Sequence, residues 1–306
     1  MEKPVSERAH TEWMVTPVGA GPVARRVVLG IVAVVTLLFL VAPLALIVSS
    51  ALSQGVGVFV RSLSDPGTQH AIWLTVITAL ITVPLNILFG LAAAWTVTKF
   101  VFPGRTLLIA LIELPYSISP IVAGVAYLFV YGSQGLFGPL LDYFGLKVMF
   151  ALPAIVLASM FVTAPFVARE LIPLMQAQGR DLEEAATSLG ASGWRTFWRV
   201  TLPNIRWPML YGIVLCNARV MGEFGAVSVV SGNVRGQTNT VPLHVELLYH
   251  DYDTAGAFAA AAVLTVLALI TLVLKVWLEG RGAGRRKPAA PSGAVSPIIP
   301  AGGLAR

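Results

Sequence analysis

Charged residues are scarce in this sequence. Only 12% of its 306 residues are Asp, Glu, Lys or Arg, and 56% are hydrophobic. A soluble globular domain carries about 25% charged residues. So little charge argues against an ordinary water-facing surface, and lipid is the expected solvent of this chain.

The sequence also has little cysteine and no nucleotide-binding loop. Cys216 is the only cysteine, which excludes an internal disulfide scaffold. The chain has no G-x-x-x-x-G-K-[ST] phosphate-binding loop. No arrangement of ligands predicts a metal site, and no catalytic residue is proposed. The histidines are scattered: His10, His70, His244 and His250.

What the chain does have is long apolar runs. A helix needs roughly 20 apolar residues to cross the hydrocarbon core of a membrane, and six runs reach that length. The first run is longer than the core of a secretory signal, so we expect it to be retained. The sequence therefore predicts an all-α membrane protein with six transmembrane helices. The runs are 27–49, 71–98, 106–131, 149–171, 209–231 and 255–278.

The basic residues predict how the helices are oriented. The formal net charge is +6, but in a membrane protein lysine and arginine mark the cytoplasmic side rather than nucleic-acid binding. With both termini in the cytoplasm, the outer loops hold only Arg61, Lys147 and Arg235, and Arg219 lies within a helix. We therefore predict an N-in and C-in chain that contacts membrane lipid and no nucleic acid.

Three parts of the chain differ in composition. Residues 1–24 and 280–306 lack hydrophobic periodicity, and both are predicted to be disordered cytoplasmic tails. Residues 25–279 form the membrane domain. Its informative cytoplasmic loop, at about 172–208, joins the fourth and fifth predicted spans.

The first half of this loop predicts a short helix. Asp181 can cap its N-terminus, and Glu184, three residues later, completes a capping box. Gly190 supplies the left-handed position that ends such a helix.

The second half predicts another short helix. Ser192 can cap it, and Pro203 and Pro208 are expected to end it before the chain re-enters the membrane. Three aromatic residues share one face of this helix: Trp194, Phe197 and Trp198. This aromatic face suits docking of a partner, but it equally suits packing under the chain's own bundle or lying in the lipid interface.

The same loop resembles the EAA loop of ABC-importer membrane subunits. The match consists of a tripeptide, a glycine at fixed spacing and a distal Leu-Pro, with Val200 where isoleucine is common. The resemblance implies the type I ABC importer permease fold and a loop whose coupling helices dock in a groove of a separate ATPase subunit. It assigns coupling roles to six residues: Glu184, Ala185, Ala186, Gly190, Leu202 and Pro203.

A finer resemblance covers most of the chain from the second run onward. Residues 113–124 and 218–232 look like the sulfate/thiosulfate permeases, and 233–246 is closer to their W-type than to their T-type subunit. This implies a non-catalytic, multi-pass subunit of the inner (plasma) membrane that forms half of an oxyanion path. The implied partners are a T-type permease, two ATPase subunits that bind ATP and Mg, and a periplasmic or extracellular sulfate-binding protein.

Two other transport functions remain open at this level. Molybdate permeases are similar around 222–225, so a molybdate or tungstate ABC permease subunit is the nearest alternative. An ATP-independent secondary anion transporter would predict inverted repeats or a pair of broken helices. The single EAA-type loop and the absence of a visible repeat favour the ABC class.

Two charges inside the fifth run form a candidate translocation site. An ionisable side chain near the middle of a membrane helix costs ~3 kcal/mol on insertion scales. Arg219 and Glu223 are spaced i, i+4, so a helix would place them on one face where they neutralise each other. They are assigned to the oxyanion path, with a purely structural ion pair as the alternative.

A proline-flanked segment in the third run is a second candidate. Pro115 and Pro120 are expected to break the helix and free backbone groups that only protein or water can satisfy. The hydroxyl groups of Ser117 and Ser119 lie between them. The segment is either a pore wall or gate, or a kink shaped for helix packing.

Overall fold

The computed structural model describes residues 21–283. Most of both predicted tails, 1–24 and 280–306, therefore lies outside the described residues. Residues 22–24 and 280–283 of these tails are helical, because the first helix begins at Pro22 and the last ends at Ala283.

Every regular element among the described residues is a helix. Helices predominate because the amide groups of a lipid-exposed chain must bond within their own segment. In chain order the elements are α1 (Pro22–Thr36), η2 (Leu37–Val41), α2 (Ala42–Leu52), α3 (Val56–Leu63), α4 (Pro66–Lys99), α5 (Arg105–Ser117), α6 (Pro120–Tyr131), α7 (Gly138–Tyr143), α8 (Leu152–Gln178), α9 (Asp181–Ser188), α10 (Gly193–Thr196), η3 (Phe197–Thr201), α11 (Leu202–Met221), α12 (Gly225–Val230), α13 (Val241–His250) and α14 (Thr254–Ala283).

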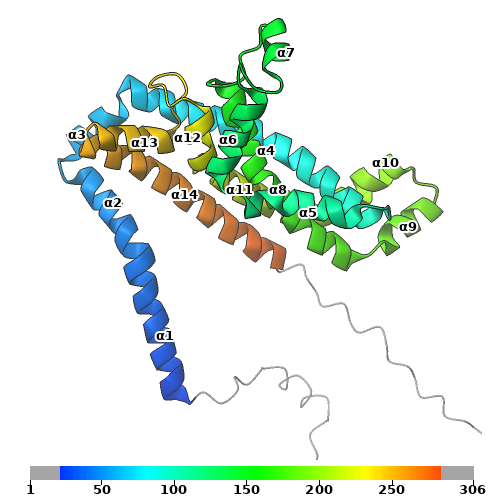
Figure 1. Ribbon diagram of the computed structural model, residues 1–306. Coiled ribbons are helices and arrows are strands. Elements are labelled where there is room, and N and C mark those ends of the chain that lie inside the picture. Colours follow the sequence, from blue (N-terminus) through cyan, green and yellow to red (C-terminus); the bar gives the residue numbers. More distant parts are fainter. Residues whose placement is uncertain (1–20, 284–306) are drawn as a thin grey trace, which may run out of the picture.

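Four helical stretches of the described chain are long and apolar enough to cross a membrane. The number is five if the bent pair α5 and α6 is counted as one span. Figure 1 shows α9 and α10 at one end of the long helices α4 and α8, and α3 and α13 at the opposite end. The four stretches are Val23–Leu52, Pro66–Lys99, Leu152–Gln178 and Thr254–Trp277.

The third and fifth apolar runs are not the continuous spans that their composition suggests. The axis turns by 109° between α5 and α6. The fifth run is split into α11 and the short α12, with residues 222–224 between them. Hydrophobic composition predicts that a segment lies in the membrane, but it does not report a break whose polar groups are satisfied by neighbouring helices.

The centre of the bundle is made by close contact of α4 with α8 and α11. Val167 and Ala168 are fully buried against α4, at the level of Gly90. Small residues allow such close approach, which is how helices gain packing energy where lipid removes the hydrophobic driving force.

A polar contact crosses the same interface. Asn86 Nδ2 donates a hydrogen bond of 2.6 Å to Thr163 Oγ1 and lies 3.6 Å from Cys216 Sγ, and all three residues are fully buried. The contact links α4, α8 and α11.

At the other end of α4, α13 is fixed by two hydrogen bonds. Thr75 Oγ1 accepts a bond of 2.9 Å from the Val241 N–H, and Thr68 Oγ1 lies 3.0 Å from His244 Nε2.

Burial lowers the pKa of His244, and nearby Arg235 lowers it further, whereas Asp65 and Asp253 oppose the shift. The folded protein therefore favours the neutral imidazole.

Gly90→Ala should destabilise the bundle. The added Cβ would lie 2.7 Å from Val167 Cβ and 2.9 Å from the Ala168 amide nitrogen, so α4 and α8 must separate. We expect a loss of about 1–3 kcal/mol, the usual cost of overpacking, measured as a lower Tm in detergent. Gly30→Ala is the matched control, because nothing lies within 4 Å of its added methyl group. Equal Tm values for the two variants would contradict the packing described for Gly90.

Acidification should weaken the folded state through His244. As pH falls below about 6.5, the unfolded chain binds a proton at this position before the folded chain does, so stability present at neutral pH is lost. His244→Gln should therefore show a smaller loss of Tm between about pH 7 and pH 5 than the parent protein. His250→Gln, at an exposed position of the same helix, should leave the parent pH dependence unchanged.

Candidate coupling and translocation sites

The loop between α8 and α11, which was predicted to be cytoplasmic, folds as two short helices joined by a glycine turn. Gly190 has a φ of +83°, the left-handed conformation predicted for it. Ser192 Oγ accepts a hydrogen bond of 3.4 Å from the Arg195 N–H and caps α10, also as predicted. The loop therefore reverses direction between α9 and α10.

Two predictions about the ends of these helices are wrong. Arg180, not Asp181, occupies the N-cap of α9 and makes no side-chain cap bond, whereas Asp181 and Glu184 lie in the first turn. Carboxylates are favourable there because of the helix dipole.

Pro203 and Pro208 also do not end the second helix. Helix α10 continues through the π-turn η3 into α11, with Pro203 in the first turn of α11 and Pro208 in its interior. Proline costs little in a first turn, and an interior proline bends a membrane helix when neighbouring helices satisfy the freed groups.

The predicted coupling residues lie largely in the open. Glu184, Ala185, Gly190 and Pro203 are exposed, and Ala186 and Leu202 are half-buried. The chain's own bundle therefore leaves this surface uncovered.

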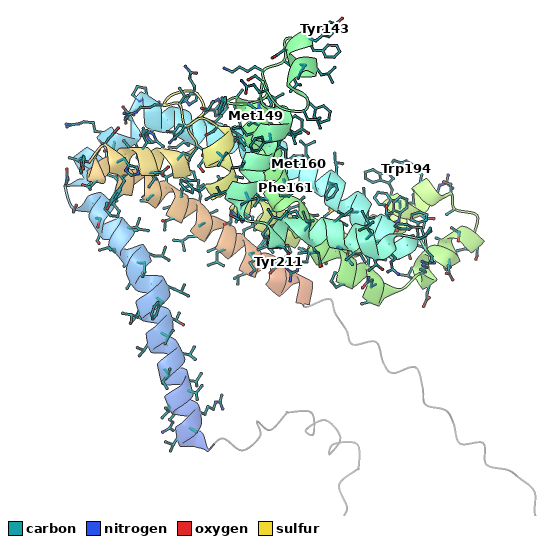
Figure 2. All side chains as sticks on the ribbon, in the orientation of Figure 1. Tyr143, Met149, Met160, Phe161, Trp194 and Tyr211 are labelled. Carbon is teal, nitrogen blue, oxygen red and sulfur yellow. The ribbon has the colours of Figure 1, made fainter. Side chains whose placement is uncertain are left out.

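Large apolar side chains extend the same exposed surface. Leu189 is 89% exposed and Trp194 is 71% exposed, and Figure 2 shows Trp194 on α10, away from the central bundle. Phe197 differs from its aromatic neighbours because its ring lies 5.3 Å from that of Trp95 on α4. The loop is thus attached to the bundle through Phe197 while its tryptophan side remains open.

The first helix break contains both predicted serines. Ser117 is the last residue of α5, and Ser119 is the N-cap residue of α6, with no side-chain cap bond. Both are exposed. Pro120 begins α6 as predicted, but Pro115 lies inside α5 and does not form one edge of the break.

The predicted ion pair is present at the second break. Arg219 Nη1 lies 2.6 Å from Glu223 Oε2, and the Glu223 side chain is fully buried while that of Arg219 is 34% exposed. Glu223 does not lie within the fifth helix as predicted, because α11 ends at Met221. Its other oxygen, Oε1, accepts a hydrogen bond of 3.0 Å from the Ala226 N–H. The Glu223 carboxylate thus pairs with Arg219 of α11 and accepts a hydrogen bond from the Ala226 amide in the first turn of α12.

The two breaks lie against each other. A Cβ at Gly225 would lie 3.0 Å from Pro120 Cβ, and one at Gly124 would lie 2.8 Å from the Ala226 carbonyl oxygen. Two glycines therefore allow α6 and α12 to pack at their N-terminal ends. A pair of broken helices was the feature expected of a secondary transporter, so this feature alone does not separate the two transport classes.

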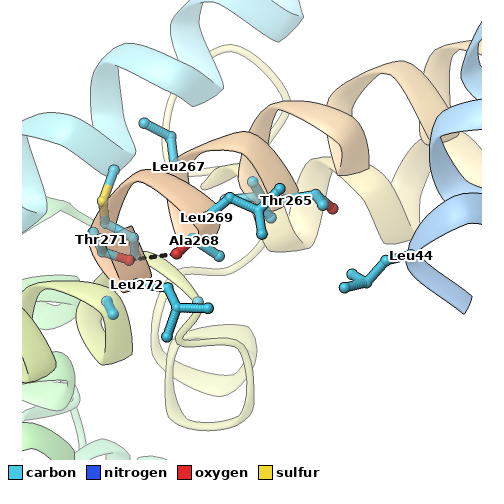
Figure 3. Close-up of a pocket in the computed structure, with 11 residues that line it drawn as sticks. Leu44, Thr265, Leu267, Ala268, Leu269, Thr271 and Leu272 are labelled. Carbon is cyan, nitrogen blue, oxygen red and sulfur yellow. Dashed lines mark hydrogen bonds between the residues drawn. The ribbon is translucent and has the colours of Figure 1, made fainter. Parts of the chain in front are cut away.

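An apolar cavity of about 380 Å³ lies beside α11, between α2 and α14. Figure 3 shows Leu44 on one side and Thr265 and Thr271 on the other. The hydroxyl groups of Thr265 and Thr271 donate to carbonyl oxygens of their own helix, those of Ala261 and Ala268. The residues that line the cavity include no cation that could attract an oxyanion.

Sequence reasoning missed the polar contact between Asn86 and Thr163. The signal was available, because Asn86 is an amide in the apolar run 71–98 and a polar residue inside a membrane needs a partner. The identity of that partner was not available, since it depends on how α4 packs on α8.

Comparison with known proteins decides the class. Residues 86–282 match the family model described as binding-protein-dependent transport system inner membrane component. The chain belongs to this family. Membership confirms the prediction of a non-catalytic, multi-pass permease of the inner membrane.

The relatives also confirm the W-type resemblance. The chain is 53% identical to the sulfate transport system permease protein CysW of Escherichia coli (strain K12), over 85% of this chain and 90% of the relative. It is 37% identical to the probable sulfate transport system permease protein cysT of Nephroselmis olivacea, over 79% of this chain and 86% of that one.

A solved structure confirms the ABC importer permease fold. The bacterial alginate ABC transporter, in complex with an alginate pentasaccharide-bound periplasmic protein, matches with a TM-score of 0.68 at 19% identity. The match covers 84% of this chain and 93% of that one. At this identity the likeness concerns the fold alone.

Removing one partner of the buried ion pair should destabilise the permease more than removing both. Arg219→Met leaves the Glu223 carboxylate buried and unpaired, and we expect a loss of about 2–3 kcal/mol, below the range for a fully buried pair because Arg219 is partly exposed. Adding Glu223→Gln should recover part of the Tm, because the amide oxygen still accepts from Ala226. A double variant less stable than Arg219→Met would contradict this account.

Proposed function

We propose that this chain is one of two permease subunits of an ATP-driven, binding-protein-dependent importer of sulfate and thiosulfate. Its 53% identity to a sulfate permease over most of both chains is the observation that carries the proposal. The proposed partners are a T-type permease subunit, two ATPase subunits that bind ATP and Mg, and a periplasmic sulfate-binding protein.

The proposed topology has six spans of the type I importer, with both termini in the cytoplasm. It counts α5 with α6 as the third span and α11 with α12 as the fifth. In this orientation Lys99, Arg105 and the loop carrying α9 and α10 lie on the cytoplasmic side, while α3, α7 and α13 lie outside. The excess of basic residues on the cytoplasmic side supports it.

The proposed coupling surface is the exposed face of α9 and the turn that follows it. Glu184, Ala185, Ala186 and Gly190 would contact the ATPase, and Leu202 and Pro203 would join the loop to α11. Their exposure supports docking, because apolar and small side chains open to water are typical of an interaction surface.

The proposed translocation site is the pair of helix breaks. Arg219 would supply positive charge to the oxyanion path, Glu223 would hold it in place, and Ser117 and Ser119 would offer hydroxyl groups. The N-terminus of α6 lies at the contact between these breaks, and helix N-termini at broken helices favour anions.

A molybdate or tungstate permease subunit is the competing assignment, because its anion has the same charge and a related shape. Similarity to the sulfate permeases of both W-type and T-type favours sulfate. Family membership speaks against a secondary transporter, despite the paired breaks.

Uptake of labelled sulfate by proteoliposomes containing the whole complex tests the proposal. We expect uptake to require ATP, to be blocked by excess thiosulfate and spared by molybdate, and to be lost in Glu184→Arg, which reverses an exposed charge of the coupling surface. Block by molybdate alone would move the substrate to the alternative. Uptake that needs neither ATP nor Glu184 would overturn the proposed coupling.

A further inference from the structure

The backbone joins α9 to the rest of the chain through a glycine on each side. Gly179, between α8 and α9, has a φ of +67°, and Gly190, between α9 and α10, has a φ of +83°. Glycine has the widest conformational freedom of any residue. Motion of α9 is therefore not transmitted rigidly along the backbone to α8 or α10, and a stiffer connection must come from side chains.

Such a connection joins α9 to the cytoplasmic end of α4. Lys99 Nζ lies 2.8 Å from Glu183 Oε1 and donates a hydrogen bond of 2.7 Å to the Gly179 carbonyl oxygen. Thr201 Oγ1 donates a bond of 3.1 Å to the same Glu183 oxygen. We call these four residues, Lys99, Gly179, Glu183 and Thr201, the α4–α9 clasp.

The side chains of the clasp are largely shielded from water, whereas Gly179 is exposed. The side chains of Lys99 and Glu183 are 10% and 22% exposed, and Thr201 is buried. A shielded ion pair that also bonds a carbonyl and a hydroxyl group is held more strongly than a solvated surface pair. The ring of Phe197 against Trp95 lies one turn away along α4 and adds an apolar contact to the same helix end.

Adjacent glutamates on α9 thus have different surroundings. Glu183 is half-buried and bonded to α4 and η3, whereas Glu184 is exposed. Neighbouring positions on a helix point about 100° apart. One glutamate can therefore face a partner protein while the other holds the permease's own helix.

Helix α4 is suited to carry a displacement away from the clasp. Its 34 residues span ~51 Å at 1.5 Å per residue. It packs along α8 and α11, the second of which ends beside Glu223. At its far end, Thr68 and Thr75 bond to α13. A shift of α4 at Lys99 therefore reaches both the broken helices and the outer face.

We propose that the α4–α9 clasp is the connection through which ATPase-driven motion of the coupling helix is transmitted to the transmembrane bundle, with Lys99 and Glu183 as its positioning residues. The inference rests on the proposed coupling of α9 to an ATPase. It assigns Glu184 to the contact with the ATPase and Glu183 to the transfer of motion within the permease.

The test uses the complete complex in proteoliposomes and measures sulfate transported per ATP hydrolysed. In Lys99→Met the ATPase subunits should still bind, because the exposed face of α9 is unchanged. The ratio of sulfate transported to ATP hydrolysed should fall about tenfold, a factor that corresponds to a typical coupling free energy. Glu183→Gln should lower it in the same way. Thr201→Val removes one hydrogen bond and should give an intermediate ratio.

Two control variants separate coupling from folding. Lys99→Arg keeps the cation and its donors, and its ratio should stay close to that of the parent. Lys147→Met removes a lysine outside the clasp and should leave the ratio unchanged. Capture of the ATPase subunits by tagged permease, measured for every variant, reports whether the docking surface has been kept.

Three outcomes are informative. A normal ratio in both Lys99→Met and Glu183→Gln would overturn the clasp. Loss of ATPase capture in these variants would also overturn it, because the clasp would then only shape the docking surface. If Glu184→Arg retains ATPase capture and coupled transport, the proposed coupling role of α9 is overturned, and with it the basis of the clasp, whatever ratio the clasp variants give.

Discussion

The fold depends on the fact that hydrocarbon offers no hydrogen-bond partner to a polar group. Each break in a membrane helix must therefore be satisfied from within the protein. Glu223 shows how this is done: one carboxylate accepts from the Ala226 amide and pairs with Arg219. It closes the gap between α11 and α12 and neutralises a charge that would otherwise be costly in the membrane.

Close packing follows from the same constraint. Because lipid tails are as apolar as leucine, helices gain by direct contact, and small residues make that contact possible. Gly90 on α4 brings the helix against Val167 of α8, and Gly225 brings α12 against Pro120 of α6. The first contact forms the centre of the bundle, and the second places the two candidate segments of the oxyanion path side by side.

The loop between α8 and α11 obeys different rules because it is largely exposed, and water can satisfy its backbone. Its helices are short and turn at glycines, and its small and apolar side chains are exposed. The loop contacts one end of α4, where Lys99 meets Glu183 and Phe197 meets Trp95. The loop thus combines an exposed surface with a partly shielded ion pair to the long helix α4, which is the arrangement that the proposed coupling role requires.

Composition and local spacing determined the class of this protein. The apolar runs predict membrane helices, Gly190 and Ser192 mark the turn of the loop between α8 and α11, and the EAA-type spacing identifies the family. These signals are readable from the sequence because they depend on residues close together in the chain. The i, i+4 spacing of Arg219 and Glu223 likewise predicted a pair that the structure contains.

Tertiary structure decided where the predictions from local sequence patterns are wrong. The neighbours that satisfy the freed backbone decide whether a helix ends at Pro203 and Pro208 or continues through them. They also decide whether Glu223 lies in a helix or beyond its end. The contacts of Glu183 with Lys99 and of Asn86 with Thr163 join residues more than 70 positions apart. No local pattern specifies such partners, since only the packing of α4 against α8 and against the loop between α8 and α11 brings them within bonding distance.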